Sequence, residues 1–245
     1  MPQLLIDGDQ YLHVAAAAIE EEVRWDDQNH VLYANYEKAW RNFTDMIRRL
    51  KARFETDDVL LCLSGGDNYR RRIDPTYKGH RQQRKPLCFA RMLESAEEAY
   101  TCVSKPGIEA DDVMGILATK PGDFNRIVVS QDKDMLGVPC TLWDKRDLIT
   151  ITEQEADYHH LYQTLVGDAS DGYKGCPGVG PKGAEKLLGR TGDQRDDWGA
   201  VVEAFRKAGL TEDDALAQAR LARILRWDDW DQEKQEPRLW SPIRA

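Results

Sequence analysis

The sequence predicts an α/β fold in which a mostly parallel central sheet is flanked by helices, with a helical region after it. Three short apolar runs have the length of buried strands, at residues 4–6, 59–63 and 127–129. Segments of helical composition separate these runs, as expected for parallel strands joined by crossover helices. The pattern then becomes helical, so we expect an α/β core at residues 1–152 and a helical region at 153–245.

The elements between the strands are predicted from the spacing of apolar residues. Residues 36–54 are expected to form an amphipathic helix, because apolar side chains recur every three or four positions. Further helices are predicted at residues 81–100 and 109–119. Residues 141–152 alternate in a way that indicates a strand pair or hairpin.

The C-terminal region is predicted to be built from helices at residues 156–166, 184–188, 193–210 and 211–225, with a Gly- and Pro-rich loop at 172–183. The last helix opens with Thr211 and Asp214 at the spacing of a capping box. Trp227, Trp230 and Trp240 are interpreted as anchors that pack the tail onto the body, with base-stacking platforms as the alternative.

Composition excludes several classes of protein. No apolar stretch approaches the ~20 residues that span a bilayer, and residues 1–9 lack the features of a signal peptide. Five scattered cysteines without a CxxC pair predict reduced thiols in a cytosolic compartment.

The net charge of −9 argues by itself against a nucleic-acid binder. However, residues 70–91 carry eight basic residues and one acid, so this segment is either a solvated helix face or a surface that contacts nucleic acid.

Acids follow each of the predicted strands. Asp7, Asp67 and Asp132 lie at or just after the three apolar runs. In open parallel sheets the C-terminal ends of the strands form the crevice that binds ligands. Counting the acids at helix starts and before the Gly-rich loop, the set has nine members: Asp7, Asp67, Glu109, Asp111, Asp112, Asp132, Asp134, Asp168 and Asp171.

So many carboxylates in one crevice would repel each other unless cations neutralised them. Capping of helix and strand ends is the alternative for any single acid, but it does not account for all of them. Mg²⁺ prefers oxygen ligands and keeps several waters, and two such ions about 3.5–4 Å apart can clamp a scissile phosphate. The pattern therefore predicts phosphodiester chemistry with two Mg²⁺ ions, for which Mn²⁺ is expected to substitute.

Six short motifs, in order, resemble those of the flap endonuclease/5′-exonuclease superfamily. They are Ile6-Asp7-Gly8, Gly66-Asp67, Tyr77-Lys78-Gly79-His80-Arg81, Gly107 to Asp112, Ser130 to Asp134, and Gly167 to Gly172 followed by Gly178 to Gly183. The C-terminal tail resembles that of the 5′-3′ exonucleases of short-tailed phages. This resemblance covers nearly the whole chain. It implies a PIN-like 5′-nuclease fold, a basic arch segment at about 70–105 and a helix–hairpin–helix-type DNA-binding loop at about 167–190.

The resemblance also implies a role for each acid. The first metal site would consist of Asp7, Asp67, Glu109 and Asp111, and the second of Asp132, Asp134 and Asp171 together with the shared Asp111. Asp112 and Asp168 would be outer-sphere or auxiliary groups. Because Glu109 and Asp111 are two positions apart, a regular helix would aim them in different directions, so the resemblance places Glu109 at an irregular helix start.

Lys78 and Arg81 match the basic residues that this family uses at the scissile phosphate, where a preplaced cation stabilises developing negative charge. Tyr77 is predicted to stack on a terminal base, with core packing as the alternative. Arg70, Arg84 and Lys85 are expected to contact DNA. The segment from residue 80 to residue 100 would form the arch, either closed over a single strand or left as an open clamp.

The glycines of the late loop support a further DNA contact. Gly178, Gly180 and Gly183 also spell the dinucleotide pattern G-x-G-x-x-G, but a Rossmann loop follows a strand, and this one follows a predicted helix. We interpret it as a helix–hairpin–helix-type loop whose backbone N–H groups approach a DNA phosphate. Lys174 and Lys182 add positive charge to it.

The resemblance implies 5′-3′ exonuclease and flap endonuclease action on DNA, in phage replication or recombination in the cytoplasm of an infected bacterium. The expected partners are DNA with 5′ ends, flaps or nicks, and RNA–DNA hybrids from which RNA primers are removed. The alternatives are a catalytically inactive DNA-junction-binding protein of the same fold, a nicotinamide-dependent oxidoreductase and a PIN-type ribonuclease.

Overall fold

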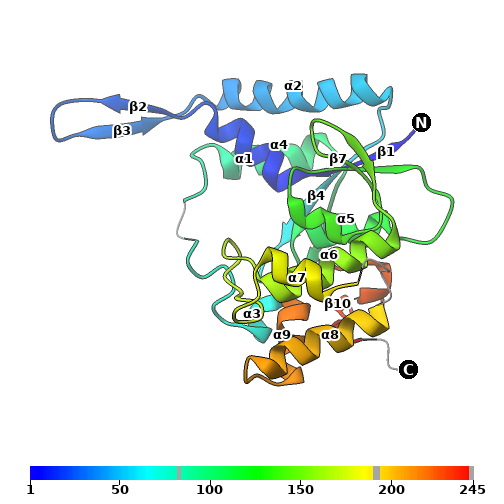
Figure 1. The fold of residues 1–245 in the computed structure, drawn as a ribbon. Coiled ribbons are helices and arrows are strands. Elements are labelled where there is room, and N and C mark those ends of the chain that lie inside the picture. Colours follow the sequence, from blue (N-terminus) through cyan, green and yellow to red (C-terminus); the bar gives the residue numbers. More distant parts are fainter. Residues whose placement is uncertain (82–83, 190–193, 243–245) are drawn as a thin grey trace.

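The computed structural model describes residues 1–81, 84–189 and 194–242. Its centre is a six-stranded sheet with the order β5-β4-β1-β6-β7-β8 (Figure 1). The strands are β1 (Gln3–Asp7), β4 (Val59–Gly65), β5 (Cys102–Pro106), β6 (Arg126–Val129), β7 (Thr141–Trp143) and β8 (Leu148–Thr150). Neighbours are parallel from β5 to β7, and β7 and β8 form an antiparallel pair. The predicted α/β fold, its mostly parallel sheet and the strand pair at 141–152 are therefore confirmed.

Helices cover both faces of this sheet (Figure 1). Side chains alternate between the faces along a strand, so Leu4 and Ile6 lie in one apolar cluster and Leu5 in another. The first cluster is closed by α1 (Gly8–Ala17), α2 (Tyr36–Phe54) and α4 (Phe89–Ala99), and the second by α5 (Ala110–Ala118) and α6 (Glu153–Val166).

The long helix α2 has the bounds that the apolar spacing predicts. Asn35 caps its first turn by accepting a hydrogen bond from the backbone N–H of Lys38, and Glu55 ends it in a left-handed conformation. Phe43 and Ile47 are fully or almost fully buried against the sheet. Burial of side chains of this size stabilises the fold by about 1.5–3 kcal/mol each.

The C-terminal region is helical, as predicted. It contains α7 (Pro181–Leu187), α8 (Gln194–Lys207) and α9 (Glu212–Ala222), which pack with α6 around a third apolar cluster. Thr211 and Asp214 form the predicted capping box of α9. The helix α7 begins at Pro181 rather than at residue 184, because proline is well suited to the first turn of a helix. Residue 193, the predicted start of α8, lies outside the described residues.

The tail packs onto the body, as the tryptophans predict. Trp240 lies against the rings of His160 and Trp198 at 4.9 and 5.2 Å between centroids. Trp230 is 1% exposed and belongs to the same apolar cluster as α5. It begins the short antiparallel pair β9 (Trp230–Asp231) and β10 (Glu236–Pro237), which follows the 3₁₀ turn η2 (Trp227–Asp229). The C-terminal segment thus contributes to the apolar core of the α/β region.

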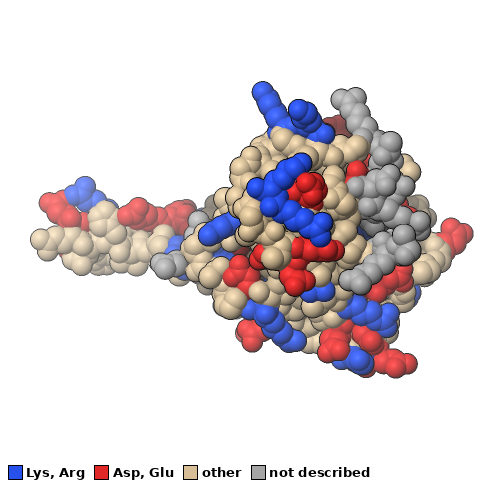
Figure 2. Space-filling view, turned by 60° about the horizontal axis from the view of Figure 1, so that its bottom comes forward, with Lys and Arg blue, Asp and Glu red and all other residues tan. Residues whose placement is uncertain are grey.

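Several elements differ from the sequence-based expectation. The helix α1, the strand β5, the 3₁₀ turn η1 (Lys133–Gly137) and the short helix α3 (Arg70–Ile73) were not predicted. The hairpin of β2 (Glu21–Arg24) and β3 (His30–Tyr33) was also not predicted, and it projects from the body as an exposed arm that carries several acidic side chains (Figures 1 and 2).

The predicted helix at 81–100 is wrong in its first half, because α4 begins at Phe89. Pro86 disfavours a helical backbone at Lys85. The preceding loop is instead held by Glu20, whose carboxylate accepts two hydrogen bonds of 2.7 Å from Arg84 and one of 2.7 Å from the backbone N–H of Leu87. None of the described helices is long and apolar enough to cross a membrane.

Candidate active site

The order of the strands brings Asp7 and Asp132 to one edge of the sheet, and Asp67 follows the neighbouring strand at the same edge. Strands β4 and β6 flank β1 in parallel, so their C-terminal ends share one edge of the sheet. Asp7 is the last residue of β1 and caps α1, accepting a hydrogen bond of 2.9 Å from the N–H of Gln10. Asp67 follows β4 and is exposed, and Asp132 follows β6 and caps a 3₁₀ turn. The strand order reverses at β1, with β4 and β5 on one side and β6 and β7 on the other, and α/β sheets bind ligands at such a switch point.

The start of α5 supplies two further carboxylates to this edge. Glu109 is the N-cap residue with an extended backbone, φ −87° and ψ 165°, and Asp111 lies in the first turn. This is the irregular start that the resemblance implies for Glu109. The backbone of β4 holds the start of α5 in place through a hydrogen bond of 2.9 Å from the Gly65 N–H to the Ile108 carbonyl.

Asp7 and Asp111 carry negative charge that the protein compensates poorly. Burial, together with the charges of Asp9 and Asp132, raises the pKa of Asp7 to about 7. Burial likewise raises the pKa of Asp111 well above its ordinary value, with added repulsion from Asp7 and Asp132. The Oδ1 atom of Asp111 is buried without a hydrogen-bond partner.

A second group of acids lies around Asp134. Burial raises the pKa of Asp134 to about 6, and the charges of Asp132 and Asp171 contribute in the same direction. The side-chain amide of Gln163 donates a hydrogen bond of 2.5 Å to Asp134 Oδ1. Asp168 is compensated: burial works to raise its pKa, but Lys133, at 2.7 Å, and the hydrogen bonds from Ser170 outweigh it and bring the pKa to about 2.

The two groups are joined by the Tyr77-Lys78-Gly-His-Arg81 motif. The Lys78 ammonium lies 2.5 Å from Glu109 Oε1 and 3.4 Å from Asp171 Oδ2, and Arg81 Nη2 lies 2.6 Å from Asp171 Oδ1. Burial lowers the pKa of Lys78, but the two carboxylates outweigh it, so its net shift is upward. Lys78 has a left-handed backbone, with φ 53°. Both cations therefore lie among the predicted metal ligands.

The prediction that Tyr77 stacks on a base is not supported by its position. Its ring is 2% exposed, so a base cannot reach its face. Its hydroxyl donates hydrogen bonds at 2.7 Å to Asp171 Oδ2 and at 3.1 Å to Glu109 Oε2. The alternative of core packing fits, and the hydroxyl positions these two carboxylates.

The prediction that Arg70 contacts DNA also requires correction. Its side chain is 1% exposed and forms a bidentate pair with Asp112, at 2.7 and 2.8 Å. It also donates to the carbonyls of Leu221 and Arg223, and Asp112 accepts from the backbone N–H of Leu225. Arg70 and Asp112 therefore join the start of α5 to the C-terminal segment, and both Asp112 oxygens are engaged within the protein.

Replacement of Arg70 with Met is expected to lower the free energy of unfolding by about 3–5 kcal/mol, because the buried Asp112 carboxylate would lose its partner. Denaturant unfolding checks this. Arg71→Met is the matched control, since Arg71 lies in the same helix and is exposed. Equal losses of unfolding free energy in the two variants would show that the buried Arg70–Asp112 pair contributes no more to stability than an exposed arginine.

The donor set suits a hard divalent cation. Its atoms are carboxylate oxygens, one of them buried and unpartnered, in a region of excess negative charge. Within the described ranges, no group of three or more His, Cys, Asp or Glu side chains is arranged to hold a metal ion as it stands. Lys78, Arg81 and Lys133 instead pair with several of the carboxylates. Binding of an ion would thus require these side chains to rotate and exchange partners.

The raised pKa values of Asp7 and Asp134 predict how stability depends on pH. An acid whose pKa is higher in the folded protein than in the unfolded chain destabilises the fold as pH rises from its unfolded to its folded pKa. Without divalent ions, the free energy of unfolding is therefore expected to fall between about pH 4 and pH 7. Added Mg²⁺ should raise the melting temperature more at pH 8 than at pH 5. Melting curves in chelator and in Mg²⁺ test this, and stability that rises with pH in chelator would contradict it.

The predicted DNA-binding loop lies between α6 and α7. Gly178, with φ 79°, and Gly180 have open space where a side chain would stand, so a ligand can approach their backbone. Lys174 and Lys182 are exposed, and Gly183 is half-buried in the first turn of α7. The loop follows a helix rather than a strand, which removes the basis for the nicotinamide alternative.

Four residues of this region were not singled out from the sequence. Gln163 and Lys133 bind Asp134 and Asp168, Ser130 lies 3.5 Å from Asp7, and Asp9 accepts from the backbone of Ser64. Lys133 and Ser130 lie inside the Ser130 to Asp134 motif and were accessible from it. Gln163 offers no sequence signal, because its role depends on where α6 packs.

Comparisons with known proteins agree on one family. Residues 2–161 match the model described as the 5′-3′ exonuclease, N-terminal resolvase-like domain. The chain is 30% identical to an exodeoxyribonuclease of Enterobacteria phage T3 over 98% of its length and 92% of that protein. It is also 30% identical to an exonuclease of Escherichia phage T7, over 98% of its length and 93% of that protein.

Solved structures share the fold. A phage T5 protein crystallised with metal ions superposes with a TM-score of 0.67, covering 91% of this chain and 89% of that one at 14% identity. A bacteriophage T5 flap endonuclease solved with DNA and metal ions gives a TM-score of 0.64 at 14% identity, covering 91% of this chain and 89% of that one.

Proposed function

This chain belongs to the 5′-3′ exonuclease family, and on that premise we propose that it hydrolyses DNA phosphodiester bonds near 5′ ends by a two-metal mechanism. The relatives from phages T3 and T7 are similar over nearly the full length of the chain. The observation that carries the proposal is the meeting of Asp7, Asp111 and Asp132 at one sheet edge, where their charges raise the pKa of their neighbours.

Two Mg²⁺ ions are proposed as the cofactors. Asp7, Asp67, Glu109 and Asp111 would hold the first, and Asp132, Asp134 and Asp171, with Asp111, the second. When bound, such ions activate a water molecule and stabilise the leaving oxygen. The proximity of the Asp67 backbone carbonyl to Gly107, two residues before Glu109, supports the inclusion of Asp67 in the first set. The crystallisation of structural relatives with metal ions supports the presence of cations.

Lys78 and Arg81 are proposed to act on the scissile phosphate. In the structure they neutralise Glu109 and Asp171, so they already lie beside the proposed metal ligands. Metal ions would take over that neutralisation and free both side chains for the phosphate. A preplaced cation there favours the transition state over the ground state, because negative charge builds up during phosphoryl transfer.

The loop between α6 and α7 is proposed to hold the duplex beyond the cut. Its exposed glycine backbone and two lysines would contact phosphates, which positions DNA without reading sequence. Flap cutting, removal of RNA primers and a role in phage replication or recombination are finer parts of the same proposal. They rest on the family and on the T5 flap endonuclease solved with DNA.

An end-labelled duplex digest tests the proposal. Release of short products from the 5′-labelled strand in Mg²⁺, with no release in chelator, is the expected result. Parallel substrates with a flap, a nick or an RNA primer separate the finer activities. Products released first from the 3′ end, or equal digestion in chelator, would overturn the proposal.

A further inference from the structure

The arm of β2 and β3 has an apolar face that stays exposed. In the register of the two strands, Val23 lies opposite Val31. Two residues nearer the body, Glu21 lies opposite Tyr33. Opposite residues of an antiparallel pair point to the same face, and so do alternate residues along each strand. Trp25 continues this row at the tip and is 78% exposed, so the face is apolar and aromatic.

The other face of the arm is polar and its charges pair with one another. Glu22 lies 2.5 Å from His30, and Arg24 pairs with Asp27 at the tip. Residues 20–33 as a whole contain five acids and one arginine, and several of the acids are visible along the arm in Figure 2. An acidic segment repels DNA phosphates, so DNA is not the partner that the apolar face favours.

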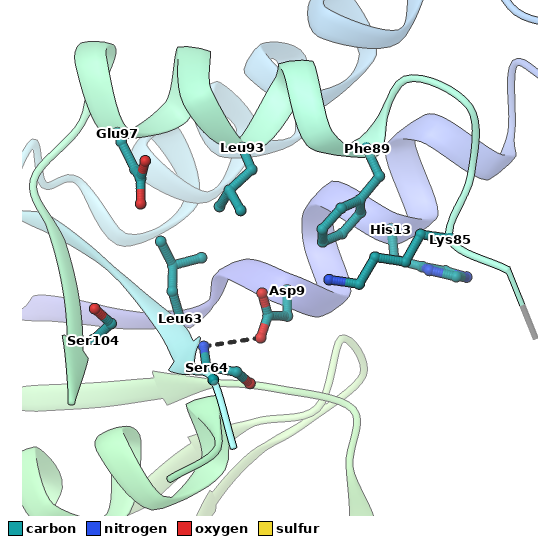
Figure 3. A pocket seen from close by; sticks show the side chains of 10 residues that line it. Asp9, His13, Leu63, Ser64, Lys85, Phe89, Leu93, Glu97 and Ser104 are labelled. Carbon is teal, nitrogen blue, oxygen red and sulfur yellow. Dashed lines mark hydrogen bonds between the residues drawn. The ribbon is translucent and has the colours of Figure 1, made fainter. Parts of the chain in front are cut away.

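The base of the arm is fixed to the body. The Glu20 carboxylate accepts two hydrogen bonds of 2.7 Å from Arg84. The ammonium of the next residue, Lys85, lies 4.3 Å from the centroid of the Phe89 ring at the start of α4 (Figure 3). Arg84 thus positions the arm, whereas the sequence predicts a DNA contact for it.

The strands of the arm lack comparable support, because every residue of β2 and β3 is exposed. An isolated two-stranded hairpin is at best marginally stable in water, and it becomes stable when an apolar face packs against another element. The arm therefore needs a partner surface that covers the row of Val23, Trp25, Val31 and Tyr33.

The outer face of α2 has the complementary chemistry. This helix contains six basic residues and two acids. Lys38, Arg41 and Arg49 are exposed, and among the described residues they have no ion-pair partner. Lys38 and Arg49 are about three turns apart, so they lie on the same side of the helix. Guanidinium groups pack favourably on aromatic rings, and the stems of Lys and Arg cover apolar surface.

The arm of one molecule points away from its own α2. It leaves the body at the N-terminal end of the helix and extends in the opposite direction (Figure 1). A twofold axis beside this link would place the arm of each copy along α2 of the other copy. An arm of about seven residues from base to tip is about 20 Å long, and a helix of the length of α2 is about 28 Å long, so the arm would cover most of the helix.

We propose that two copies of this chain form a twofold dimer in which the arm of each copy packs on α2 of the other. In this arrangement Glu21 faces Arg41 of the partner subunit, and Trp25 lies against Arg49 of the partner subunit. Tyr, Trp and Arg are the residue types enriched in protein interfaces. Because the contact is made twice, the pair is closed and does not extend into a filament. The dimer does not depend on hydrolysis.

Sedimentation velocity of the full chain without DNA tests the dimer. At micromolar concentration, the expected mass is twice the 28.0 kDa of one chain. Trp25→Ser should raise the dissociation constant of the dimer by about tenfold or more, because buried tryptophans carry much of the binding energy of interfaces. Leu148→Ser, which removes a 54% exposed side chain from β8, is the control and should leave it unchanged. A natural protein with the mass of one chain, or equal effects of the two variants, would overturn the proposal.

An exchange of charges tests which surfaces meet. Glu21→Arg and Arg41→Glu should each weaken the dimer by about tenfold, because like charges then face each other at both copies of the contact. The two substitutions together should restore most of the affinity, because opposite charges meet again. Both positions are exposed, so the melting temperature of each variant should match that of the natural protein. A double variant as weak as the single variants would contradict this packing.

DNA affinity separates the dimer from an arm that contacts DNA. Trp25→Ser is expected to bind a DNA duplex as tightly, per chain, as the natural protein does. A chain that remains monomeric and loses DNA affinity in Trp25→Ser would place the arm on DNA and contradict the dimer. Because the mass is measured without DNA or metal ions, a dimer that cuts no DNA would contradict the proposed function alone.

Discussion

Replacement of Asp111 with Asn is expected to lower the rate of DNA hydrolysis by at least about a thousandfold, equivalent to about 4 kcal/mol of transition-state stabilisation. Asp111 is the proposed ligand of both metal ions, and an amide is a weaker, uncharged ligand. DNA binding should persist, because the contacts of the Gly-rich loop are retained. Single-turnover hydrolysis and binding measured in Ca²⁺ separate the two effects.

The same variant is expected to be more stable than the natural protein in chelator. Asn removes a negative charge from a place where burial and three neighbouring acids disfavour it. Each kcal/mol of relieved repulsion would raise the melting temperature by about 2–4 °C in a chain of this size. Asp123→Asn, at an exposed position between α5 and β6, is the control for both measurements. Normal turnover in Asp111→Asn would show that Asp111 is not a ligand shared by the two metal ions.

Replacement of Lys78 with Ala is expected to reduce the single-turnover rate by about 10²–10³, the range found when one preorganised donor to a developing negative charge is lost. Affinity for DNA should change by much less, because Lys78 is one of several cations proposed to contact DNA. The backbone adds little to this effect, since Ala and Lys tolerate the left-handed φ of 53° equally poorly.

The control for Lys78→Ala is Lys207→Ala, at the end of α8, where the ammonium pairs only weakly with Glu203 at 3.5 Å. A large fall in affinity with an unchanged chemical step would make Lys78 a binding residue rather than a catalytic one. Rescue of the rate by Lys78→Arg would support a role for positive charge at this position.

Much of the fold was accessible from local sequence patterns. The buried strands, the helix at 36–54 and the strand pair near Trp143 follow from apolar spacing, which packing in the structure then satisfies. The unpredicted α1 directly follows β1 without a loop, so its start could not be separated from the strand. All residues of the arm of β2 and β3 are exposed. Because neither face is buried and each strand has only four residues, the alternation of apolar and polar residues is too short to predict the strands.

The acids of the proposed site could be predicted because they follow the ends of strands. The contacts of the basic residues could not be predicted as well. Arg70 and Arg71 are adjacent in sequence, but one is buried and the other is exposed. The difference arises from carbonyls at Leu221 and Arg223, about 150 positions away, which no local pattern reveals. Tyr77 was misassigned for the same reason, because its partner Asp171 is distant in sequence.

The contacts of Arg70 also limit how the molecule can be divided. The matched family model ends at residue 161, yet the carbonyls that fix Arg70 and the N–H that fixes Asp112 belong to residues 221, 223 and 225. A shortened chain made only of the N-terminal portion would leave the Arg70 guanidinium and the Asp112 carboxylate without these backbone partners, and Asp112 lies in the first turn of the helix that also carries Asp111. Limited proteolysis within the C-terminal segment is therefore expected to inactivate the protein rather than to release an active N-terminal fragment.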